Sequence, residues 1–404
     1  MTTHTTRTMS NASTLEDRVA LPAQGKQARR RVAHLSSAHQ RNDTRIFMKQ
    51  CRTLAAHGYE VSLVVADGKG NECRDGVTIA DVGRLPGLLQ RVFRTTRRVF
   101  EQAIALDADI YHLHDPELIL VGLALKRRGK TVIFDSHEDV PRQLLGKPYL
   151  GPVTRRVLSK SFALLERYVC ARFDGIIAAT PFIRDSFLKI HPLTVDVNNF
   201  PMAEELDAAH GSADKLSEVC YVGGIGEVRG IRELVHACAL LGSSGRLNLV
   251  GSFFEPAVEA QVKADPGWAR VNELGFLDRA GVRDVMRRSA AGLVNFLPLP
   301  NHLDSLPTKM FEYMASGIPV IASDFPLWRE IIEGNRCGLC VDPTDPKAIA
   351  AAIDYLLANP DIARSMGENG RKAVHDKYNW SVQAARLIDF YGVISHAKQT
   401  VPAH

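Results

Sequence analysis

The chain has 404 residues, of which 45% are hydrophobic and 24% are charged, and a formal net charge of +5 at pH 7. This length exceeds what one hydrophobic core usually supports, so we expect two domains. No apolar run approaches the ~20 residues that span a bilayer, which argues against an integral membrane protein. Residues 1–31 are rich in Thr, Ser and Arg and lack the apolar segment of a signal peptide, so we expect a disordered tail and a cytoplasmic protein.

The charge is unevenly distributed. Residues 1–200 hold 30 Lys and Arg against 20 Asp and Glu, a net charge of +10, and the remainder carries −5. We therefore expect the first half to meet an anionic partner. Seven cysteines are scattered along the chain, and the one close pair, Cys337 and Cys340, lies in a short apolar run, which favours reduced packing residues over a metal or redox site.

From residue 31 onward, apolar strand-like runs alternate with helical patterns, which predicts parallel sheets built of βαβ units. In the first half we expect strands at residues 32–35, 60–66, 109–117, 131–135 and 175–180, and helices at residues 45–57 and 158–173. The polar loop at residues 36–44 leaves two interpretations open. His39 and Arg45 contact a substrate there, or the loop is simply solvated and Asp43 or Thr44 caps the following helix.

Two histidines share one face of the strand at residues 109–117. Because side chains alternate along a strand, His112 and His114 point the same way. A metal site would need a third ligand, and none is evident in the sequence, so we expect no metal. His114 lies at the carboxyl end of the strand, where open α/β sheets bind ligands, and is a candidate for acceptor-side contact.

Cationic and apolar side chains are interleaved in two segments of the first half. On a helical projection of residues 88–100, the apolar residues fall on one side, and Arg91, Arg94, Arg97 and Arg98 fall mainly on the other. A second basic cluster occupies residues 142–160, where Gly and Pro interrupt regular structure. Such patterns suit an anionic membrane surface or a lipid diphosphate, although a core-facing helix with a solvated side explains residues 88–100 equally well.

The second half begins with a strand and a glycine-rich loop at residues 219–230, and its most informative stretch is residues 304–324. Pro307 suits the first turn of a helix, good helix formers continue to Ala315, and Gly317 and Pro319 end it before a buried strand at residues 320–322. Asp304, Lys309 and Glu312 therefore gather near a helix N-terminus. Free backbone N–H groups at such a terminus favour an anion.

This stretch resembles the donor-site signature of the retaining family 4 glycosyltransferases, which have two Rossmann-like domains facing across a cleft, the GT-B fold. The signature is an acidic residue, seven others, a glutamate, and then a small-residue segment ending in Gly-x-Pro-Val-Ile. Asp304 stands in place of the first glutamate and Glu312 matches the second. Family members also carry Gly-Arg after the first strand of the second domain, with a Lys-Gly pair further on. Here Gly224 occupies the arginine place and Arg229 the lysine place.

The resemblance implies a role for each candidate residue. Glu312 would hold the ribose, Lys309 would replace the missing arginine beside the diphosphate, and His137, at a strand end, would lie near the reacting sugar. The implied catalytic residues are His137, Asp304, Arg229 and Lys309. The implied nucleotide-sugar contacts are Gly223, Gly224, Arg229, Ser305, Leu306, Lys309 and Glu312. The acceptor-side candidates are His39, Arg45 and His114.

The implied architecture is a disordered tail at residues 1–31, an acceptor-side Rossmann-like domain at 32–201, a nucleotide-sugar-binding domain at 202–378, and a crossover helix and tail at 379–404, with Trp380 and Tyr391 as anchors on the first domain. We expect a retaining hexosyltransferase that takes its sugar from a UDP- or GDP-sugar, without cofactor or metal. The acceptor would be lipid-linked or a saccharide, in the synthesis of cell-surface polysaccharide or glycolipid. The alternatives are an epimerase of the same fold or a non-catalytic nucleotide-sugar-binding protein. A nucleic-acid partner is not expected.

Overall fold

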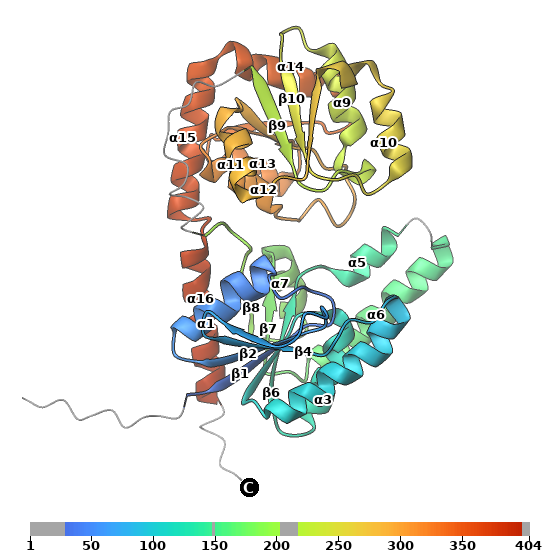
Figure 1. Ribbon diagram of the computed structural model, residues 1–404, viewed down its shortest axis with the longest axis vertical. Helices are drawn as coiled ribbons and strands as arrows, with labels where there is room; N and C mark the ends of the chain where they lie inside the picture. Colours follow the sequence, from blue (N-terminus) through green and yellow to red (C-terminus); the bar gives the residue numbers. More distant parts are fainter. Residues whose placement is uncertain (1–28, 148–149, 203–216, 398–404) are drawn as a thin grey trace, which may run out of the picture.

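The computed structural model describes residues 29–147, 150–202 and 217–397, so residues 1–28 of the predicted tail lie outside the described residues. Two parallel-dominated α/β domains lie one above the other in Figure 1. Below, the first domain means β1 to β8 with their helices, and the second domain means β9 to α15. The helix α16 (Trp380–Ala397) follows the second domain in sequence but packs on the first. The expected two-domain α/β architecture with a returning C-terminal helix is therefore confirmed.

The first domain is built on an eight-stranded sheet in the order β3-β4-β2-β1-β5-β6-β7-β8, parallel except for the β3–β4 pair. Its strands are β1 (Arg31–Leu35), β2 (Glu60–Val65), β3 (Glu72–Arg74), β4 (Val77–Asp81), β5 (Ile110–Leu113), β6 (Thr131–Ser136), β7 (Gly175–Ala178) and β8 (Thr194–Asp196). We did not predict the β3–β4 hairpin, because two short edge strands show little apolar alternation. The central strands are buried, as their continuous apolar runs predict.

Helices cover both faces of this sheet. They are η1 (Thr44–Cys51), α1 (Arg52–Ala56), α2 (Leu88–Gln90), η2 (Arg91–Thr95), α3 (Thr96–Leu106), η3 (Pro116–Leu118), α4 (Ile119–Lys126), α5 (Val140–Leu145), α6 (Pro152–Cys170) and α7 (Pro181–Leu188). Asp43 caps η1, since its carboxylate accepts hydrogen bonds from the amides of Arg45 and Ile46. The start predicted for α6 at residue 158 was wrong. The helix begins at Pro152, because proline fits the first turn.

The expectation that the apolar residues of 88–100 share one helix face was also wrong. Leu88, Leu89 and Phe93 are exposed, whereas Thr96 and Val99 are buried against the core. The physical reason is the π-helical segment η2, which lies between α2 and α3. A π turn takes an extra residue, so the part of the helix that follows it is rotated relative to a regular 100° projection. The exposed apolar residues are therefore confined to the first two turns.

The second domain holds a six-stranded parallel sheet in the order β11-β10-β9-β12-β13-β14. The strands are β9 (Glu218–Val222), β10 (Arg246–Val250), β11 (Val271–Gly275), β12 (Ala291–Val294), β13 (Val320–Ser323) and β14 (Gly338–Val341). The helices are η4 (Glu227–Arg229), α9 (Ile231–Leu240), α10 (Pro256–Lys263), η5 (Pro266–Arg270), α11 (Arg279–Arg288), α12 (Thr308–Ala315), α13 (Pro326–Ile332), α14 (Pro346–Ala358) and α15 (Pro360–Asp376). The predicted strands of this domain all occur, with shifts of one or two residues at their ends.

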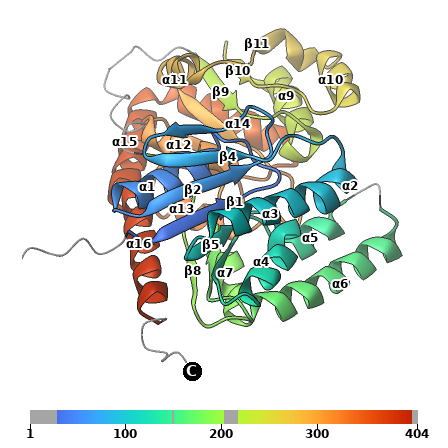
Figure 2. The same cartoon turned by 60° about the horizontal axis from the view of Figure 1, so that its bottom comes forward.

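The chain returns to the first domain through α15 and α16, which form the long column at the left of Figure 1. Trp380 opens α16 and is buried, donating from its backbone to the carbonyl of Pro201 and from its indole to the hydroxyl of Thr53. Tyr391 lies in the core of the first domain. Both residues are anchors, as expected. In Figure 2, α16 lies on the opposite side of the first sheet from α3, α4 and α6, and the two hydrophobic clusters of that sheet divide in the same way.

A buried acid on α6 makes the stability of the first domain depend on pH. Burial, helped by the carboxylate of Asp139, raises the pKa of Glu166 to about 8. An ordinary glutamate has a pKa of about 4.3, so the folded chain retains a proton that the unfolded chain releases. The stabilisation is complete below about pH 4 and is lost as the pH rises through about 8. Between these limits the free energy of unfolding should fall by up to ~1.4 kcal/mol per pH unit.

Glu166→Gln, which cannot ionise, should lack this slope. Denaturant unfolding at pH 5.5, 7 and 8.5 measures the difference between the variant and the unmodified chain. The exposed Glu330 provides a matched control, and Glu330→Gln should follow the unmodified chain. Equal pH dependence in all three proteins would show that Glu166 is not protonated in the fold.

Candidate active site

A pocket of about 600 Å³ lies between the domains, where loops at the carboxyl ends of strands from both sheets meet. Parallel strands place these loops at one edge, so residues far apart in the sequence converge there. Seven of the predicted site residues line the pocket: Arg45, His137, Arg229, Asp304, Ser305, Leu306 and Lys309. The other five lie outside its lining: His39, His114, Gly223, Gly224 and Glu312.

The helix α12 places Lys309 in its first turn, beside the pocket. This helix starts after Pro307 without a side-chain cap, so its first N–H groups remain available to an anion. The Lys309 side chain is buried, and its Nζ has no hydrogen-bond partner among the described residues. The ammonium lies 3.7 Å from the ring centre of Tyr221, and the loop at Gly223 passes beside it. Burial, followed by the nearby charge of Arg229, lowers the pKa of Lys309 well below its usual value.

Arg229, at the end of η4, is the second cation of the pocket. Its guanidinium lies between two phenyl rings, 5.4 Å from that of Phe254 and 5.5 Å from that of Phe296, and Nη1 donates to the carbonyl of Gly224 at 3.1 Å. Among the described residues, neither Arg229 nor Lys309 forms an ion pair with a carboxylate. Aromatic faces hold both cations in place without neutralising them. The arrangement therefore favours an anionic ligand with two or more negative oxygens.

Packing explains why Gly224 stands where the family usually has an arginine. A Cβ atom on Gly224 would overlap the ring of Phe254, which follows β10. This ring fills the space beside the loop and lies against Arg229, which lines the pocket, and Phe254 itself is 63% exposed. Phe254 is thus a candidate ligand contact that we did not predict. The sequence feature that could have indicated this contact is the Phe253-Phe254 pair, which lies between polar residues at the end of a strand.

The two carboxylates of the signature occupy different environments. Glu312 is half-buried on α12, one turn after Lys309. Asp304 pairs across the domain boundary with Arg142, at 2.9 Å between Oδ2 and Nη1, and the Arg142 guanidinium stacks on Phe182 at 3.9 Å. Each partner of this ion pair is more than a third exposed, so the pair contributes no more than ~1 kcal/mol and is readily exchanged for a ligand contact. Arg142 belonged to the predicted membrane-facing cluster, and that placement was wrong because its side chain lines the pocket.

In the first domain, His137 reaches the pocket from the end of β6. Its Nε2 lies 3.2 Å from Oδ2 of Asp135, a fully buried carboxylate. Arg45 binds the same carboxylate through two contacts of 2.6 and 3.0 Å, and Gln50 donates to it at 2.8 Å. The guanidinium of Arg45 is therefore engaged inside the fold, although the residue lines the pocket. His114 is also buried, with Nδ1 at 3.4 Å from Asp135.

His39 lies next to this group without lining the pocket. Its ring centre is 5.1 Å from that of His137, and its Nδ1 lies 2.9 Å from the carboxylate of Asp115. Burial opposes protonation of His39, but the hydrogen bond with Asp115 outweighs it and raises the pKa of His39. The side chain is about one third exposed, so His39 could reach a bound acceptor only after a change of rotamer.

Two family models match the chain. "Glycosyltransferase Family 4" matches residues 44–197, and "Glycosyl transferases group 1" matches residues 202–373. The chain belongs to glycosyltransferase family 4 and has the GT-B fold. The boundary between the two matches, at residues 197–202, lies where the chain passes from the first sheet to the second.

Relatives and solved structures agree with this family. A GDP-mannose-dependent alpha-(1-6)-phosphatidylinositol monomannoside mannosyltransferase of Mycobacterium tuberculosis is 35% identical over 88 residues, which are 22% of this chain and 23% of that relative. This match spans less than a quarter of the relative's length. A phosphatidyl-myo-inositol mannosyltransferase of Mycolicibacterium smegmatis is 25% identical over 317 residues, 75% of this chain and 76% of the relative. Sucrose-phosphate synthase from Thermosynechococcus elongatus shares the fold with a TM-score of 0.72 at 21% identity, over 91% of this chain and 100% of that one.

Because Lys309 is buried and its Nζ has no hydrogen-bond partner among the described residues, removing its amine should have opposite effects on stability and on ligand binding in this family 4 chain. Lys309→Met keeps the length of the side chain and removes the buried amine. The ligand-free variant should therefore be more stable, by about 1–3 kcal/mol, because no hydrogen bond is lost. Its affinity for a nucleoside diphosphate should fall at least ~10-fold and any turnover ~100-fold, as for loss of one preorganised donor. Thermal unfolding and calorimetric titration with UDP and GDP measure both effects.

The exposed Lys347 provides the control, and Lys347→Met should change neither quantity. A Lys309→Met variant that binds nucleoside diphosphates as the unmodified chain does would exclude Lys309 from the donor site.

Proposed function

We propose that the protein is a retaining glycosyltransferase that moves a hexose from a UDP- or GDP-sugar to an acceptor hydroxyl, in the synthesis of cell-surface polysaccharide or glycolipid. The observation that carries this proposal is a pair of basic side chains, Arg229 and Lys309, which line an interdomain pocket and have no carboxylate partner among the described residues. A diphosphate bound beside α12 would supply their missing counter-charge. The mannosyltransferase relatives support a hexose as the transferred group.

In the proposed step, the bond between the anomeric carbon and the diphosphate oxygen breaks, and the acceptor oxygen bonds to the same face of that carbon. The acceptor proton passes to an oxygen of the departing diphosphate. Negative charge grows on the diphosphate as the bond breaks, and Arg229, Lys309 and the amides that follow Leu306 stabilise it. His137 lines the pocket from the first domain, which supports a contact with the sugar or the acceptor. The step needs no metal or cofactor.

The donor assay separates this proposal from its two alternatives. The chain would be incubated with UDP- and GDP-sugars, with and without a saccharide or lipid-linked acceptor, and release of diphosphate would be followed with transfer of sugar. A transferase releases diphosphate together with an acceptor-dependent product. Donor turnover that does not depend on any acceptor indicates an epimerase. Binding without any release indicates a nucleotide-sugar-binding protein, and the proposal is then wrong.

The role proposed for Glu312 predicts a defect in binding of the nucleotide itself. Its charge would accept two ribose hydroxyls, and Glu312→Gln keeps the size of the side chain and removes that charge. Loss of two charge-assisted hydrogen bonds should weaken UDP or GDP binding about 10-fold or more. Calorimetric titration measures this, with Glu330→Gln as the exposed control. Unchanged affinity in Glu312→Gln would make Glu312 a packing residue of α12.

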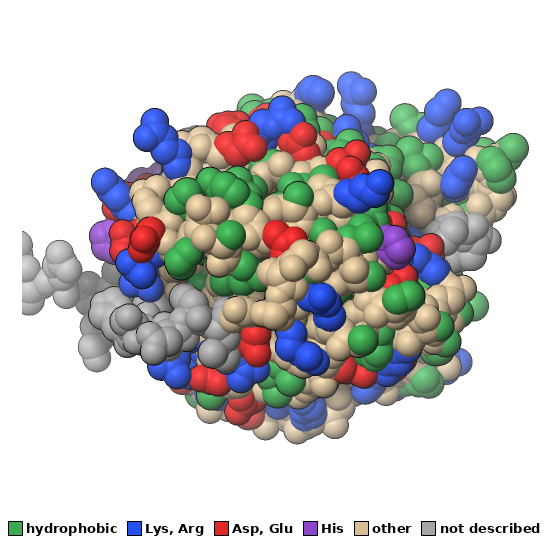
Figure 3. All heavy atoms as spheres, turned by 90° about the horizontal axis from the view of Figure 1, so that it is seen from above, with side chains coloured by type: hydrophobic (Ala, Val, Ile, Leu, Met, Phe, Trp, Pro, Cys, Tyr) green, Lys and Arg blue, Asp and Glu red, His purple; other side chains and the backbone are tan. Residues whose placement is uncertain are grey.

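We also propose that an anionic membrane surface binds the first domain, along α6 and the α2–η2 tip. No helix among the described residues is both long and apolar enough to cross a bilayer. Four apolar residues on one side of α6 are more than half exposed: Val153, Val157, Leu164 and Tyr168. They lie at positions i, i+4, i+11 and i+15, with Arg156, Lys160 and Arg167 along the same stripe. Figure 3 shows basic and apolar side chains crowded at the right edge of the molecule, where this region projects.

Leu88, Leu89 and Phe93 on α2 and η2 are also exposed apolar residues of the first domain. Apolar side chains bordered by cations are the pattern of helices that lie in the headgroup region of anionic bilayers. Two of the arginines of residues 88–100 have partners within the first domain. Arg91 pairs with Glu117 at 2.8 Å, and Arg98 donates to the carbonyl of Val82. The charges expected to meet lipid are therefore mainly those of α6.

Vesicle sedimentation tests this surface. The chain should bind vesicles that contain anionic lipid more tightly than neutral ones, and binding should fall as the salt concentration rises from ~0.05 to ~0.5 M. Val157→Ser with Leu164→Ser should weaken binding at all salt concentrations, whereas Arg156→Gln with Lys160→Gln should weaken it mainly at low salt. The control is Ile362→Ser with Val393→Ser, exposed apolar residues on α15 and α16. Equal recovery with both vesicle types would make a soluble saccharide the better acceptor.

A further inference from the structure

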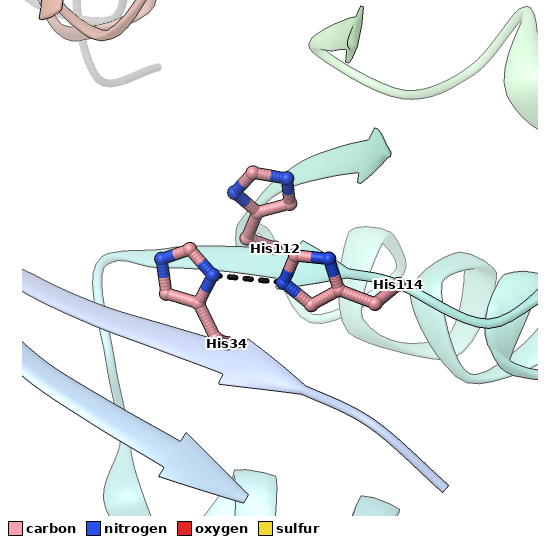
Figure 4. Close-up of side chains that lie close together, drawn as sticks. All are labelled: His34, His112 and His114. Carbon is pink, nitrogen blue, oxygen red and sulfur yellow. Dashed lines mark hydrogen bonds between the residues drawn. The ribbon is translucent and has the colours of Figure 1, made fainter. Parts of the chain in front are cut away.

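Three histidines lie side by side in the core of the first domain, behind the pocket. Figure 4 shows His34 on β1, His112 on β5 and His114 directly after β5, with their rings close together. All three are buried, and Nδ1 of His34 lies 2.8 Å from Nε2 of His114. His114 in turn contacts Asp135 at 3.4 Å and His137 at 3.3 Å. A continuous set of polar contacts therefore joins the core to the pocket.

His34 is the third potential metal ligand that we did not find in the sequence, so the geometry has to decide between a metal and hydrogen bonds. The ligand atoms of His34, His112 and His114 lie within 4.8 Å of one another. Two nitrogens on one tetrahedral zinc lie roughly 3.3 Å apart, since each bond is about 2.0–2.1 Å. The 2.8 Å between His34 Nδ1 and His114 Nε2 instead matches an N–H···N hydrogen bond, and the two ring planes are nearly parallel, at 13°. We therefore interpret the cluster as a hydrogen-bonded network.

The protonation states of this network follow from its burial. Burial lowers the pKa of His114 to about 3 and the pKa values of His34 and His112 well below the usual value, so all three are neutral at pH 7. Burial opposes ionisation of Asp135, but the adjacent Arg45 guanidinium holds its pKa well below its usual range. Asp135 is therefore an ionised carboxylate that only accepts hydrogen bonds.

This charge determines which nitrogen of His137 carries the proton. Nε2 of His137 faces Oδ2 of Asp135, so Nε2 donates the hydrogen bond. Nδ1 has no hydrogen-bond partner among the described residues, and the side chain is 18% exposed at the pocket. An imidazole that carries its proton on Nε2 alone presents a bare Nδ1, which accepts a hydrogen bond from a hydroxyl group.

The network also reaches the crossover helix. The hydroxyl of Tyr391 on α16 lies 2.8 Å from Nδ1 of His112. The other nitrogen of His112 lies 3.8 Å from Oδ2 of Asp135 and has no hydrogen-bond partner in the described part of the chain. The His112 ring thus stands between Tyr391 and Asp135. Removal of the tyrosine hydroxyl would free this ring to turn beside the carboxylate.

We propose that Asp135 is a positioning residue that presents His137 to the pocket with Nε2 protonated and Nδ1 bare. Nδ1 then accepts a hydrogen bond from a hydroxyl group of the bound sugar or acceptor. Tyr391 supports this arrangement through His112. The identity of the ligand that His137 contacts rests on the proposed function, whereas the tautomer of His137 does not. Through Tyr391, His112 and Asp135, α16 is then linked to the active site in addition to packing on the first domain. The groups that face His137 are Asp135, His114 and His39, and Arg45 faces it through Asp135.

Nitrogen-15 NMR of the ligand-free, histidine-labelled chain tests the tautomer without any activity assay. His137→Gln assigns the signal. We expect a proton on Nε2 and none on Nδ1, and Asp135→Asn should shift this signal toward a mixture of tautomers. A ring protonated on Nδ1 in the unmodified chain overturns the proposal. If Asp135→Asn does not fold, the spectrum of the unmodified chain and the Tyr391 variant still decide.

Kinetics test the link to α16. Tyr391→Phe removes one hydroxyl and should lower kcat about 3- to 10-fold, the range for loss of one hydrogen bond, with nucleotide affinity unchanged. Asp135→Asn should lower kcat about 100-fold or more. Tyr59, whose ring contacts that of Tyr391 at 5.6 Å, provides the control, and Tyr59→Phe should leave kcat unchanged. Equal kcat in Tyr391→Phe and the unmodified chain overturns the link. A chain with the expected tautomer but no sugar transfer would instead refute the proposed function.

Discussion

The apolar contact between α16 and the first sheet is the interaction on which the two-domain arrangement depends. Leu387, Phe390 and Ile394 are buried in the core of the first domain, although they follow the second domain in sequence. Gly175 on β7 makes this contact possible, because a Cβ there would lie 2.6 Å from the Phe390 ring and 3.0 Å from Ile394. Full burial of each such side chain contributes about 1.5–3 kcal/mol. The returning helix therefore holds the carboxyl edges of both sheets opposite one another, and the pocket is formed between these edges.

The two sides of the pocket use opposite ways of controlling charge. In the second domain, Arg229 and Lys309 lie against aromatic rings, and neither has a carboxylate partner among the described residues. In the first domain, the charge of Asp135 is satisfied by Arg45 and Gln50, and the buried imidazoles of His34, His112 and His114 behind it are neutral. A ligand in which a negative diphosphate adjoins a hydroxyl-bearing sugar would match both sides, as the proposed donor does. Because these groups are fixed before the ligand binds, little reorganisation is needed during the reaction.

Some errors in the sequence-based expectations have clear physical causes. The helical projection of residues 88–100 failed because η2 is a π-helical segment, which changes the helical period without a visible signal in residue type. Arg142 could not be separated from the neighbouring lysines and arginines, since only the packing of its guanidinium on Phe182 directs it into the pocket. His34 was overlooked because it lies in a buried strand, 78 residues before His112. Parallel pairing of β1 with β5 brings the two rings together.

The sequence by itself determined the alternation of strands and helices, the division into two α/β units, and the glycosyltransferase signature around α12, because these depend on local periodicity, on helix punctuation by Pro307 and Gly317, and on fixed spacing. Only the tertiary structure decided which side chains meet. It engages Arg45 and His114 with Asp135 inside the first domain and gives Lys309 Nζ no hydrogen-bond partner within the described part of the chain. It also places the ring of Phe254 against Gly224 and connects Tyr391 to His112. Each of these contacts joins residues from different elements of the fold. Their distances depend on how strands pair and helices pack, and no local pattern in the chain records that information.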